Sequence, residues 1–253
     1  MCVLAFAWQA HPRWHLVLAG NRDELHARPA APLALWPGAG EVIAGRDLEA
    51  GGTWLGVSGQ GRLAVVTNLR GHGGPAPGMA SRGALVADIL AGGGAHADIA
   101  TTDLARFNPF NLIVADGAQA RFLTNQPAPA RTALAHGLYG LSNGTLDEPW
   151  PKTMELKAAL LDWMVRDRAE PAALLDSLRN DTLPDFGLTP GAPSDIPQEP
   201  RLSPVFIRNP VYGTRCSTVV TVDRAGKGMI VERRFDAEGA AISETALSFD
   251  WRL

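Results

Sequence analysis

The chain has 253 residues, enough to bury about three quarters of the surface that its unfolded form exposes, so we expect a sizeable hydrophobic core. Hydrophobic residues make up 46% and charged residues 19% of the chain, which is ordinary globular composition. The formal net charge of −3 provides no basic surface for nucleic acid, and we predict no nucleic-acid partner.

The cysteine content and the apolar runs predict a compartment. Only two cysteines are present, Cys2 and Cys216, which argues against a disulfide framework and fits a reducing environment. The first apolar run follows no basic segment of the kind that begins an export signal. No run of 18 uncharged apolar residues occurs, so we predict a cytoplasmic protein without an integral membrane span.

The first half of the chain predicts strand pairs. Residues 2–8 and 15–19 are short, β-rich runs separated by a turn that contains Pro12. Residues 53–70 hold two apolar runs around Ser-Gly-Gln-Gly, and residues 111–124 hold two more around Asp-Gly, a strong hairpin signal. These strands are therefore expected to be largely antiparallel.

Helices and a long loop are predicted next. Residues 81–92 have apolar residues at helical spacing after a capping Ser81, and residues 97–107 are also expected to be helical. Longer helical patterns follow, with Pro151 near the first turn of one of them. The full set of later elements is a helix in 150–167, a helix in 170–180, a Pro- and Gly-rich loop at 182–204, and strands at 216–223 and 228–236.

This order, strand pairs followed by helices and then strands, predicts a layered α+β architecture rather than alternating βαβ units. The Pro-rich stretch lies within the element order rather than between two self-contained halves. We therefore predict a single domain over residues 1–253.

Cys2 is the first candidate for chemistry. If the initiator Met1 is removed, Cys2 carries a free α-amine, with a pKa of about 7.7–8.0, beside a thiol with a pKa of about 8.5. One residue would then supply both a nucleophile and the base that activates it. The alternative is a small buried residue at the head of a strand.

Four polar stretches at strand ends could complete such a site: residues 18–29, 65–73, 139–152 and 211–220. Turn and capping roles are the alternative for Asn, Asp and Gly there. A cysteine hydrolase needs a carboxylate to hold the amine, amide donors for a tetrahedral oxyanion and a cation that favours the thiolate. Asp23, Asn68, Asn143 and Arg215 could meet these needs.

At this point the chain resembles a known family. The motifs are Met-Cys at the start, NRDE at 21–24, GGTWLG at 51–56, TN at 67–68, FNLIVAD at 110–116, GLSN with PW within 140–150, and YGTR at 212–215. Together they are similar to the NRDE family, the transport-and-Golgi-organisation group. The resemblance covers essentially the whole chain and implies a four-layer αββα N-terminal-nucleophile sandwich, two mainly antiparallel sheets covered by helices.

A more distant resemblance, to cysteine hydrolases of the bile-salt-hydrolase and penicillin-V-acylase type, carries the chemistry. Those enzymes begin Met-Cys and place a G-R-N-x-D run near residue twenty, so Cys2 and Asp23 match. Asn68, Asn143 and Arg215 are similar to their later Asn and Arg residues. Gly20 stands where the motif has arginine, and Arg22, two places later, is the candidate replacement. The residues that we expect to bind substrate are Asn21, Arg22, Trp54 and Arg70.

The histidines have no metal-binding spacing, so no structural metal site is predicted. The NRDE resemblance also implies links to haem mobilisation and lipid homeostasis. A haem carrier needs only an apolar slot with an exchangeable axial ligand. His72 is the candidate haem ligand, with Met79 and Cys2 also available, and a solvated loop is the alternative role for His72.

The leading functional prediction is a cysteine amidohydrolase that cleaves a linear, non-peptide C–N amide bond and requires no cofactor. Its partner would be a small-molecule amide. The rival is a non-catalytic carrier or trafficking protein that binds haem as cargo, or an acyl lipid, in the same cleft. A third class is a scaffold or trafficking-interaction protein. We also predict that Met1 is removed and that Cys2 lies in a cleft within reach of Asp23.

Overall fold

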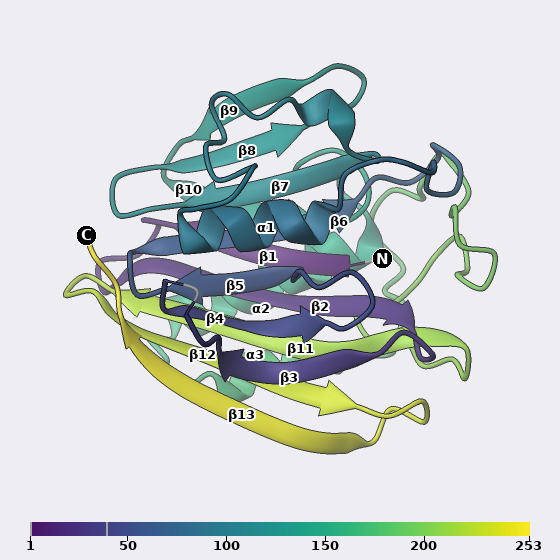
Figure 1. Ribbon diagram of the computed structural model, residues 1–253. Coiled ribbons are helices and arrows are strands. Elements are labelled where there is room, and N and C mark those ends of the chain that lie inside the picture. Colours follow the sequence, from purple (N-terminus) through teal and green to yellow (C-terminus); the bar gives the residue numbers. More distant parts are fainter. Residues whose placement is uncertain (1, 39) are drawn as a thin grey trace.

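The computed structural model describes residues 2–38 and 40–253, and its strands form two antiparallel sheets stacked face to face (Figure 1). The first sheet has the strand order β10-β1-β2-β11-β12-β13. Its strands are β1 (Cys2–Trp8), β2 (Trp14–Leu25), β10 (Gly137–Leu141), β11 (Tyr212–Asp223), β12 (Lys227–Phe235) and β13 (Ala241–Asp250). In this sheet Arg22 pairs with Cys2 on one side and with Cys216 on the other.

The second sheet follows chain order from β3 to β9, each strand pairing with the next. Its strands are β3 (Ala30–Leu35), β4 (Val42–Asp47), β5 (Leu55–Ser58), β6 (Arg62–Asn68), β7 (Phe110–Ala115), β8 (Ala120–Thr124) and β9 (Ala130–Leu134). Short turns suffice for such a meander because antiparallel neighbours need no crossover.

Helices cover the outer faces of both sheets. Helix α1 (Arg82–Ala91) packs on β4, β5 and β6, while α2 (Pro151–Val165) and α3 (Ala172–Ser177) pack on the first sheet. Ser81 begins α1 by accepting a hydrogen bond from the N–H of Ala84, and Gly92 ends it in the left-handed conformation, with φ of 67°. The arrangement is therefore helix, sheet, sheet, helix.

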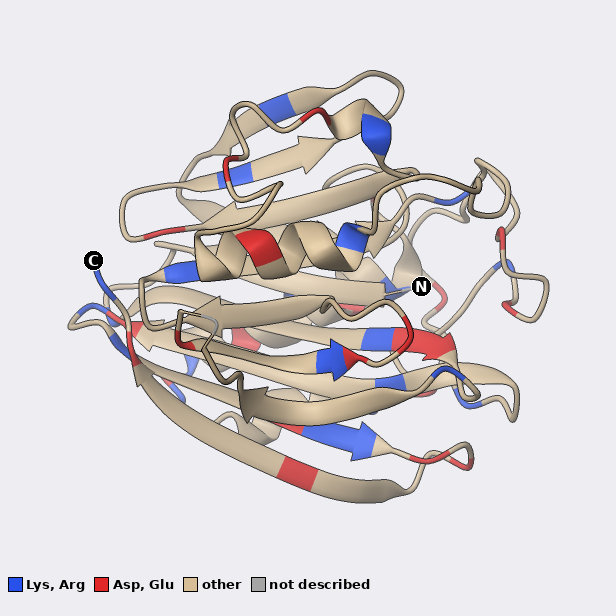
Figure 2. Ribbon diagram, in the orientation of Figure 1, with Lys and Arg blue, Asp and Glu red and all other residues tan. Residues whose placement is uncertain are grey.

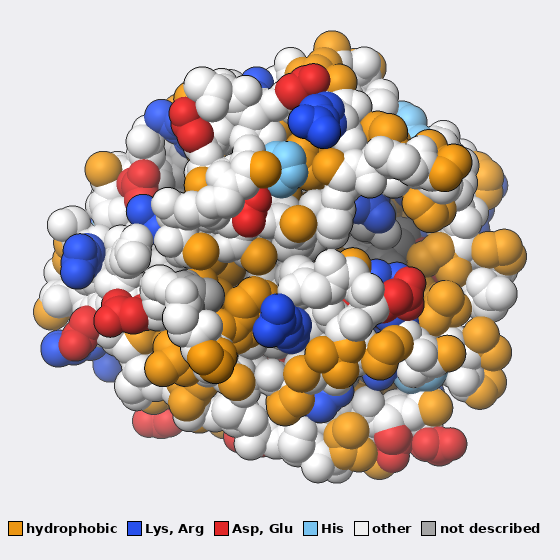
Figure 3. Space-filling model, viewed as in Figure 1, with side chains coloured by type: hydrophobic (Ala, Val, Ile, Leu, Met, Phe, Trp, Pro, Cys, Tyr) orange, Lys and Arg blue, Asp and Glu red, His pale blue; other side chains and the backbone are white. Residues whose placement is uncertain are grey.

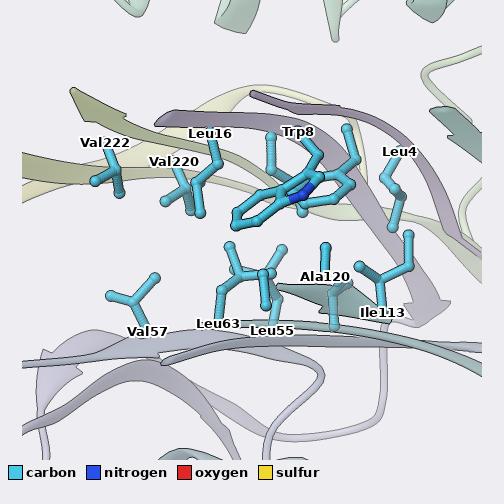
Figure 4. Packing of buried hydrophobic residues seen from close by; sticks show 14 of the residues in the cluster. Leu4, Trp8, Leu16, Leu55, Val57, Leu63, Ile113, Ala120, Val220 and Val222 are labelled. Atoms are coloured by element: carbon cyan, nitrogen blue, oxygen red, sulfur yellow. The ribbon is translucent and has the colours of Figure 1, made fainter. Parts of the chain in front are cut away.

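The central strands of both sheets are buried on both faces because each sheet lies between the other sheet and a layer of helices. In β1, Leu4, Phe6 and Trp8 point into the space between the sheets, while the alternate residues pack under α2. Figure 4 shows Leu4 and Trp8 with Leu16 and Val220 facing Leu55, Leu63 and Ile113 of the second sheet. Alternate residues of one strand therefore contribute to two hydrophobic cores, one on each face of the sheet.

Several predicted elements differ from the structure. Residues 97–107 are not an α-helix: they hold only a 3₁₀ turn at Leu104–Arg106, begun by Asp103, whose side chain accepts from Ala105 N. Strand β2 continues to Leu25, so the NRDE run lies within a strand rather than after one. Strands β3, β4, β9, β10 and β13 were not predicted. Most residues of β13 are exposed and only Leu247 and Phe249 pack against the core between the sheets, so its apolar alternation is short and was missed.

Candidate active site

Cys2 lies at the start of β1, where the stacked sheets open at one end. Its residue is partly buried and lines a cleft of about 290 Å³. Figure 3 shows this face hollowed at the place where Figure 1 marks the N terminus. The cleft is lined by Cys2, Arg22, Asp23, Glu24, Arg28, Asp47, Ala50, Thr53, Trp54, Val66, Asn68, Met79, Ala80, Ser81, Arg82, Gly83 and Asn108. A larger hollow of about 550 Å³ lies beside β12 and β13 and includes none of the predicted site residues.

Two polar contacts hold Cys2. Its main-chain nitrogen donates to Asn143 Oδ1 at 3.3 Å, and its carbonyl oxygen accepts from Ser142 Oγ at 2.8 Å. Burial raises the pKa of the Cys2 thiol, and Asp23 adds to this, whereas Arg22 acts in the opposite direction. The thiol is therefore neutral at neutral pH unless a neighbouring base takes its proton. Met1, whose removal we predicted, lies outside the described residues.

Asn143 is fixed by contacts that join the two sheets. Its Nδ2 donates to the carbonyl oxygen of Asn68 at 2.7 Å, and Ser142 Oγ donates to the carbonyl oxygen of Cys2 at 2.8 Å. Asn143 is fully buried and lines a small cavity behind Asn68 rather than the cleft itself. Asn68, at the end of β6, does line the cleft. The two asparagines thus meet, with Asn143 beside the Cys2 nitrogen and Asn68 beside the open space.

Asp23 is a buried carboxyl next to Cys2. Thr214 Oγ1 donates to Asp23 Oδ1 at 2.6 Å, and the Tyr212 hydroxyl donates to the Asp23 carbonyl oxygen at 3.1 Å. Burial raises the pKa of Asp23, and the ammonium of Lys152 is the largest opposing influence. Lys152 is itself buried, with Nζ donating to Ser203 Oγ at 3.0 Å. The polar layer beneath Cys2 therefore contains a carboxyl and an ammonium.

Arg22 lines the cleft with Cys2, and its role as the replacement for the motif arginine at position 20 stays a prediction. A side chain at Gly20 would have its Cβ 2.9 Å from Leu4 Cβ, so the backbone of β1 leaves no room there. Arg22 stacks over Trp54, with its Cζ 4.4 Å from the ring centre, and its Nη2 lies 3.3 Å from Asp47 Oδ2. Both residues line the cleft with Cys2, and Arg22 is 6% exposed.

The remaining predicted residues do not line the cleft. Asn21 points to the other side of β2, where its amide donates to the carbonyl oxygens of Leu178 and Val205. Arg70 is buried against Trp150 and lies 3.7 Å from Glu199. Arg215 donates to the carbonyl oxygens of Leu25 and Arg28. These contacts hold loops and strand ends in place.

His72 is exposed on the loop after β6 and is also absent from the cleft lining. Its main-chain N–H lies 3.4 Å from Asp195 Oδ2, alongside the N–H groups of Gly71 and Gly73 that bind the same carboxylate. The loop is thereby joined to the Pro-rich segment. This position separates His72 from Cys2 and Asp23.

The sequence interpretation missed Arg82 and Lys152. Arg82 is the first residue of α1 and lines the cleft, and burial lowers the pKa of its guanidinium. Lys152 occupies the first turn of α2. Both residues lie near the start of a predicted helix. The helix dipole disfavours a positive charge there, and a basic residue at this position is the signal that could have identified them.

Figure 2 shows basic and acidic segments close together where β2, β4 and the first turn of α1 meet. Within residues 2–38 and 40–253, no group of three or more His, Cys, Asp or Glu side chains could hold a metal ion. None of the helices in this part of the chain is long and apolar enough to cross a membrane.

Two stacked antiparallel sheets covered by helices, with a cysteine heading the first strand, define an N-terminal-nucleophile-hydrolase fold. The crystal structure of the mutant C2A conjugated bile acid hydrolase from Clostridium perfringens matches this fold with a TM-score of 0.52, covering 100% of this chain and 97% of that one at 7% identity. The chain belongs to the Transport and Golgi organisation 2 family, whose profile matches residues 1–237.

Similar curated proteins support this family membership. The human Transport and Golgi organization protein 2 homolog is 33% identical over 268 residues, which is 92% of each chain. The bovine homolog is 35% identical over 262 residues, again 92% of each chain. The resemblance to the NRDE, transport-and-Golgi-organisation group that the motifs predicted is therefore confirmed.

Proposed function

We propose that the chain is an N-terminal cysteine amidohydrolase that cleaves a linear, non-peptide C–N amide bond once Met1 has been removed. One observation carries this proposal: the Cys2 nitrogen donates to Asn143 Oδ1 at 3.3 Å beside a cleft that Cys2 and Asp23 both line. After processing, that nitrogen is an α-amine, which can take the thiol proton. The hydrolase fold supports the proposal, as does the bile acid hydrolase whose mutant alters its cysteine at position two.

In the proposed reaction the Cys2 sulfur forms a bond to the amide carbonyl carbon while its proton moves to the α-amine. The C–N bond then breaks, and the leaving amine takes that proton. Water adds to the resulting thioester, which releases a carboxylic acid and restores the thiol. Each step is balanced with water as the only co-reactant.

Each neighbouring residue has a role in this proposal. Asn143 holds the amine through Oδ1, and the buried Asp23 stabilises its protonated form. Asn68 is the cleft residue placed to donate to the oxyanion, a contact typically worth about 3 kcal/mol. Arg22 supplies positive potential in place of Arg215, which does not line the cleft.

The test uses Cys2→Ala and Cys2→Ser with a panel of linear N-acyl amides. We expect kcat/KM to fall by about 10³-fold or more in both variants. Cys216→Ser is the matched control, because Cys216 is buried and contacts Glu232 rather than the cleft. Unchanged turnover in both Cys2 variants contradicts the mechanism. Intact-mass measurement of the purified protein tests the mechanism independently. If Met1 is retained, Cys2 has no free α-amine and the proposed proton transfer cannot occur.

The second candidate is a non-catalytic carrier of haem or an acyl lipid that uses the same cleft. Met79 and Cys2 both line it, and thioether and thiolate sulfur are known axial ligands of haem iron. His72 has no place in this proposal because it lies outside the cleft lining. Stoichiometric protein should then shift the haem absorption band, and Met79→Leu should weaken the shift. Absence of both a spectral shift and a co-purifying lipid dismisses the carrier.

A further inference from the structure

The cleft contains one cation that its neighbours leave unpaired. Arg28 Nε lies 2.6 Å from Asp47 Oδ2, and Arg22 Nη2 lies within 4 Å of both Asp47 and Glu24. Among the described residues, Arg82 lies in no ion pair, and its Nη1 donates to the neutral carbonyl oxygen of Pro109 at 2.9 Å. Glu24 and Asp47 are therefore engaged by Arg22 and Arg28, and no carboxylate of the described residues lies within 4 Å of the Arg82 guanidinium.

The backbone around Arg82 adds to this positive potential. Arg82 is the first residue of α1, a helix with no acidic residue in its first turn. Ser81 Oγ accepts from Ala84 N, so the N–H groups of Arg82 and Gly83 are first-turn donors without an intrahelical acceptor. Ser81, Arg82 and Gly83 all line the cleft. A helix N-terminus in this position favours an anion.

This end of α1 is held in place by close packing. Thr53 N donates to the carbonyl oxygen of Gly83 at 3.1 Å, and a Cβ added at Gly52 would lie 2.2 Å from the carbonyl carbon of Gly83. Two glycines thus allow the loop after β4 to touch the first turn of α1. The donors are therefore fixed at the cleft rather than free to turn away.

A second, independent observation comes from Arg22. Its side chain is 6% exposed, lines the same cleft, and has an Nη1 atom without a hydrogen-bond partner in the described part of the protein. A buried guanidinium N–H without an acceptor is costly, and a bound anion would provide one. Trp54, against which Arg22 stacks, forms an apolar wall of the cleft together with Val66 and Met79.

We propose that the cleft binds an anionic ligand through Arg82, Arg22 and the first turn of α1, and that the substrate is an amide with an apolar acyl chain and a carboxylate or similar anion near the scissile bond. The substrate class rests on the proposed hydrolase function, whereas the anion site does not. Arg82 is then a specificity-determining residue.

Matched amides test the substrate class. N-octanoylglycine carries its anion on the amine side, N-butyladipamic acid carries it on the acyl side, and N-octanoylpropylamine and N-butylhexanamide are the neutral counterparts. We expect kcat/KM for one of the anionic amides to exceed that of its neutral counterpart by at least about tenfold. The pair of compounds with the larger ratio of kcat/KM, anionic over neutral, shows whether the anion lies on the amine side or on the acyl side of the scissile bond.

Arg82→Gln should lower this ratio by at least about tenfold, and Arg82→Lys should restore part of it, since a point charge replaces the guanidinium. Arg166→Gln is the control, because Arg166 lies in an exposed ion pair with Asp162 on α2. Equal kcat/KM for anionic and neutral amides overturns the proposal, as does an Arg82→Gln variant that lowers both to the same extent.

Binding separates this proposal from the hydrolase function. Titration calorimetry of the Cys2→Ala variant with N-octanoylglycine and N-octanoylpropylamine measures affinity without turnover. If no amide is hydrolysed but the anionic compound binds more tightly in an Arg82-dependent manner, the hydrolase proposal fails and the anion site stands. If amides are hydrolysed and binding shows no dependence on charge or on Arg82, the anion site fails alone.

Discussion

The core between the sheets and the cleft at its end are built from the same strand faces. Along β1 the residues that face the second sheet are Trp8, Phe6 and Leu4, and the next on that face is Cys2. Along β2 the corresponding face passes from Leu16 and Leu18 through Gly20 to Arg22 and Glu24. The alternation continues unchanged while the residue type changes from apolar to reactive and charged.

This comparison teaches where chemistry can be placed on such a fold. Close-packed neighbours fix Trp8 and Leu18, so the strands that carry them are rigid. Cys2, six positions from Trp8, and Arg22, four positions from Leu18, inherit that rigidity without the covering layer. Cys2 and Arg22 are therefore held in register by the core but remain in contact with the cleft. Rigid elements position reactive groups more accurately than loops do.

The largest expected difference between the two regions is in stability. Trp8→Ala removes a side chain that is 1% exposed, so we expect unfolding free energy to fall by about 3–5 kcal/mol. Urea denaturation measures it. Leu161→Ala on α2 is the control, since Leu161 is 50% exposed and its loss should change stability by about 0.5 kcal/mol or less. Equal losses in the two variants contradict the assignment of Trp8 to the core.

Asp23→Asn should act in opposite directions on activity and stability. Loss of the charge beside the amine lowers kcat/KM by about 10²-fold or more if Asp23 acts as proposed. Burial raises the pKa of Asp23, so the native state binds a proton more tightly than the unfolded state, and wild-type stability falls as pH rises from the ordinary value of 3.8 through the raised pKa. Above that window the uncharged Asn avoids the cost of a buried carboxylate.

The stability of Asp23→Asn relative to wild type should therefore be highest at neutral pH and should decline as pH falls through the window. Denaturant titrations from pH 3 to pH 8 measure this difference. Asp250→Asn is the control, because Asp250 lies in an exposed ion pair with Lys227. A relative stability that grows toward acid pH refutes the raised pKa.

Thiol alkylation compares the cleft with the sheet interior directly. Burial raises the pKa of Cys2, so its reaction with iodoacetamide should increase through pH 9 without reaching a plateau. Cys216 is more deeply buried, and burial with Glu232 raises its pKa well above 9.0, so it should stay unmodified while the protein is folded. Mass spectrometry of the peptides that contain Cys2 and Cys216 measures how far each thiol has been alkylated. A plateau for Cys2 near pH 7 contradicts the expected direction.

The sequence predicted the layers better than the site. Cys2, Asp23 and Asn143 lie together, and the catalytic roles that the family resemblance implied for them stay predictions. Arg215 and Asn21 were placed in the site, but their side chains bind main-chain carbonyl groups. Which of two neighbouring strand residues faces a cleft depends on register, and register is not visible in a motif.

Arg82 shows why the rest of the site could not be predicted. It stands eighty residues after Cys2, in a segment whose pattern indicates only the start of a helix. Its proximity to Cys2 arises from the packing of α1 on the second sheet and from the contact between Gly52 and Gly83. Such a contact joins two elements that local sequence does not relate.

The smallest expected effect tests whether Ser81, at the N-terminal end of α1, affects ligand preference in the cleft or only the stability of the fold. Ser81→Ala removes the side-chain acceptor for Ala84 N, which should lower unfolding free energy by about 1 kcal/mol. Ser243→Ala in the exposed strand β13 is the control, with little change expected. If the first turn of α1 holds an anion, Ser81→Ala should also lower the preference for N-octanoylglycine over N-octanoylpropylamine, because a fraying turn no longer fixes Arg82. A loss of stability without any loss of this preference assigns Ser81 to the fold alone and leaves the guanidinium as the source of the selectivity.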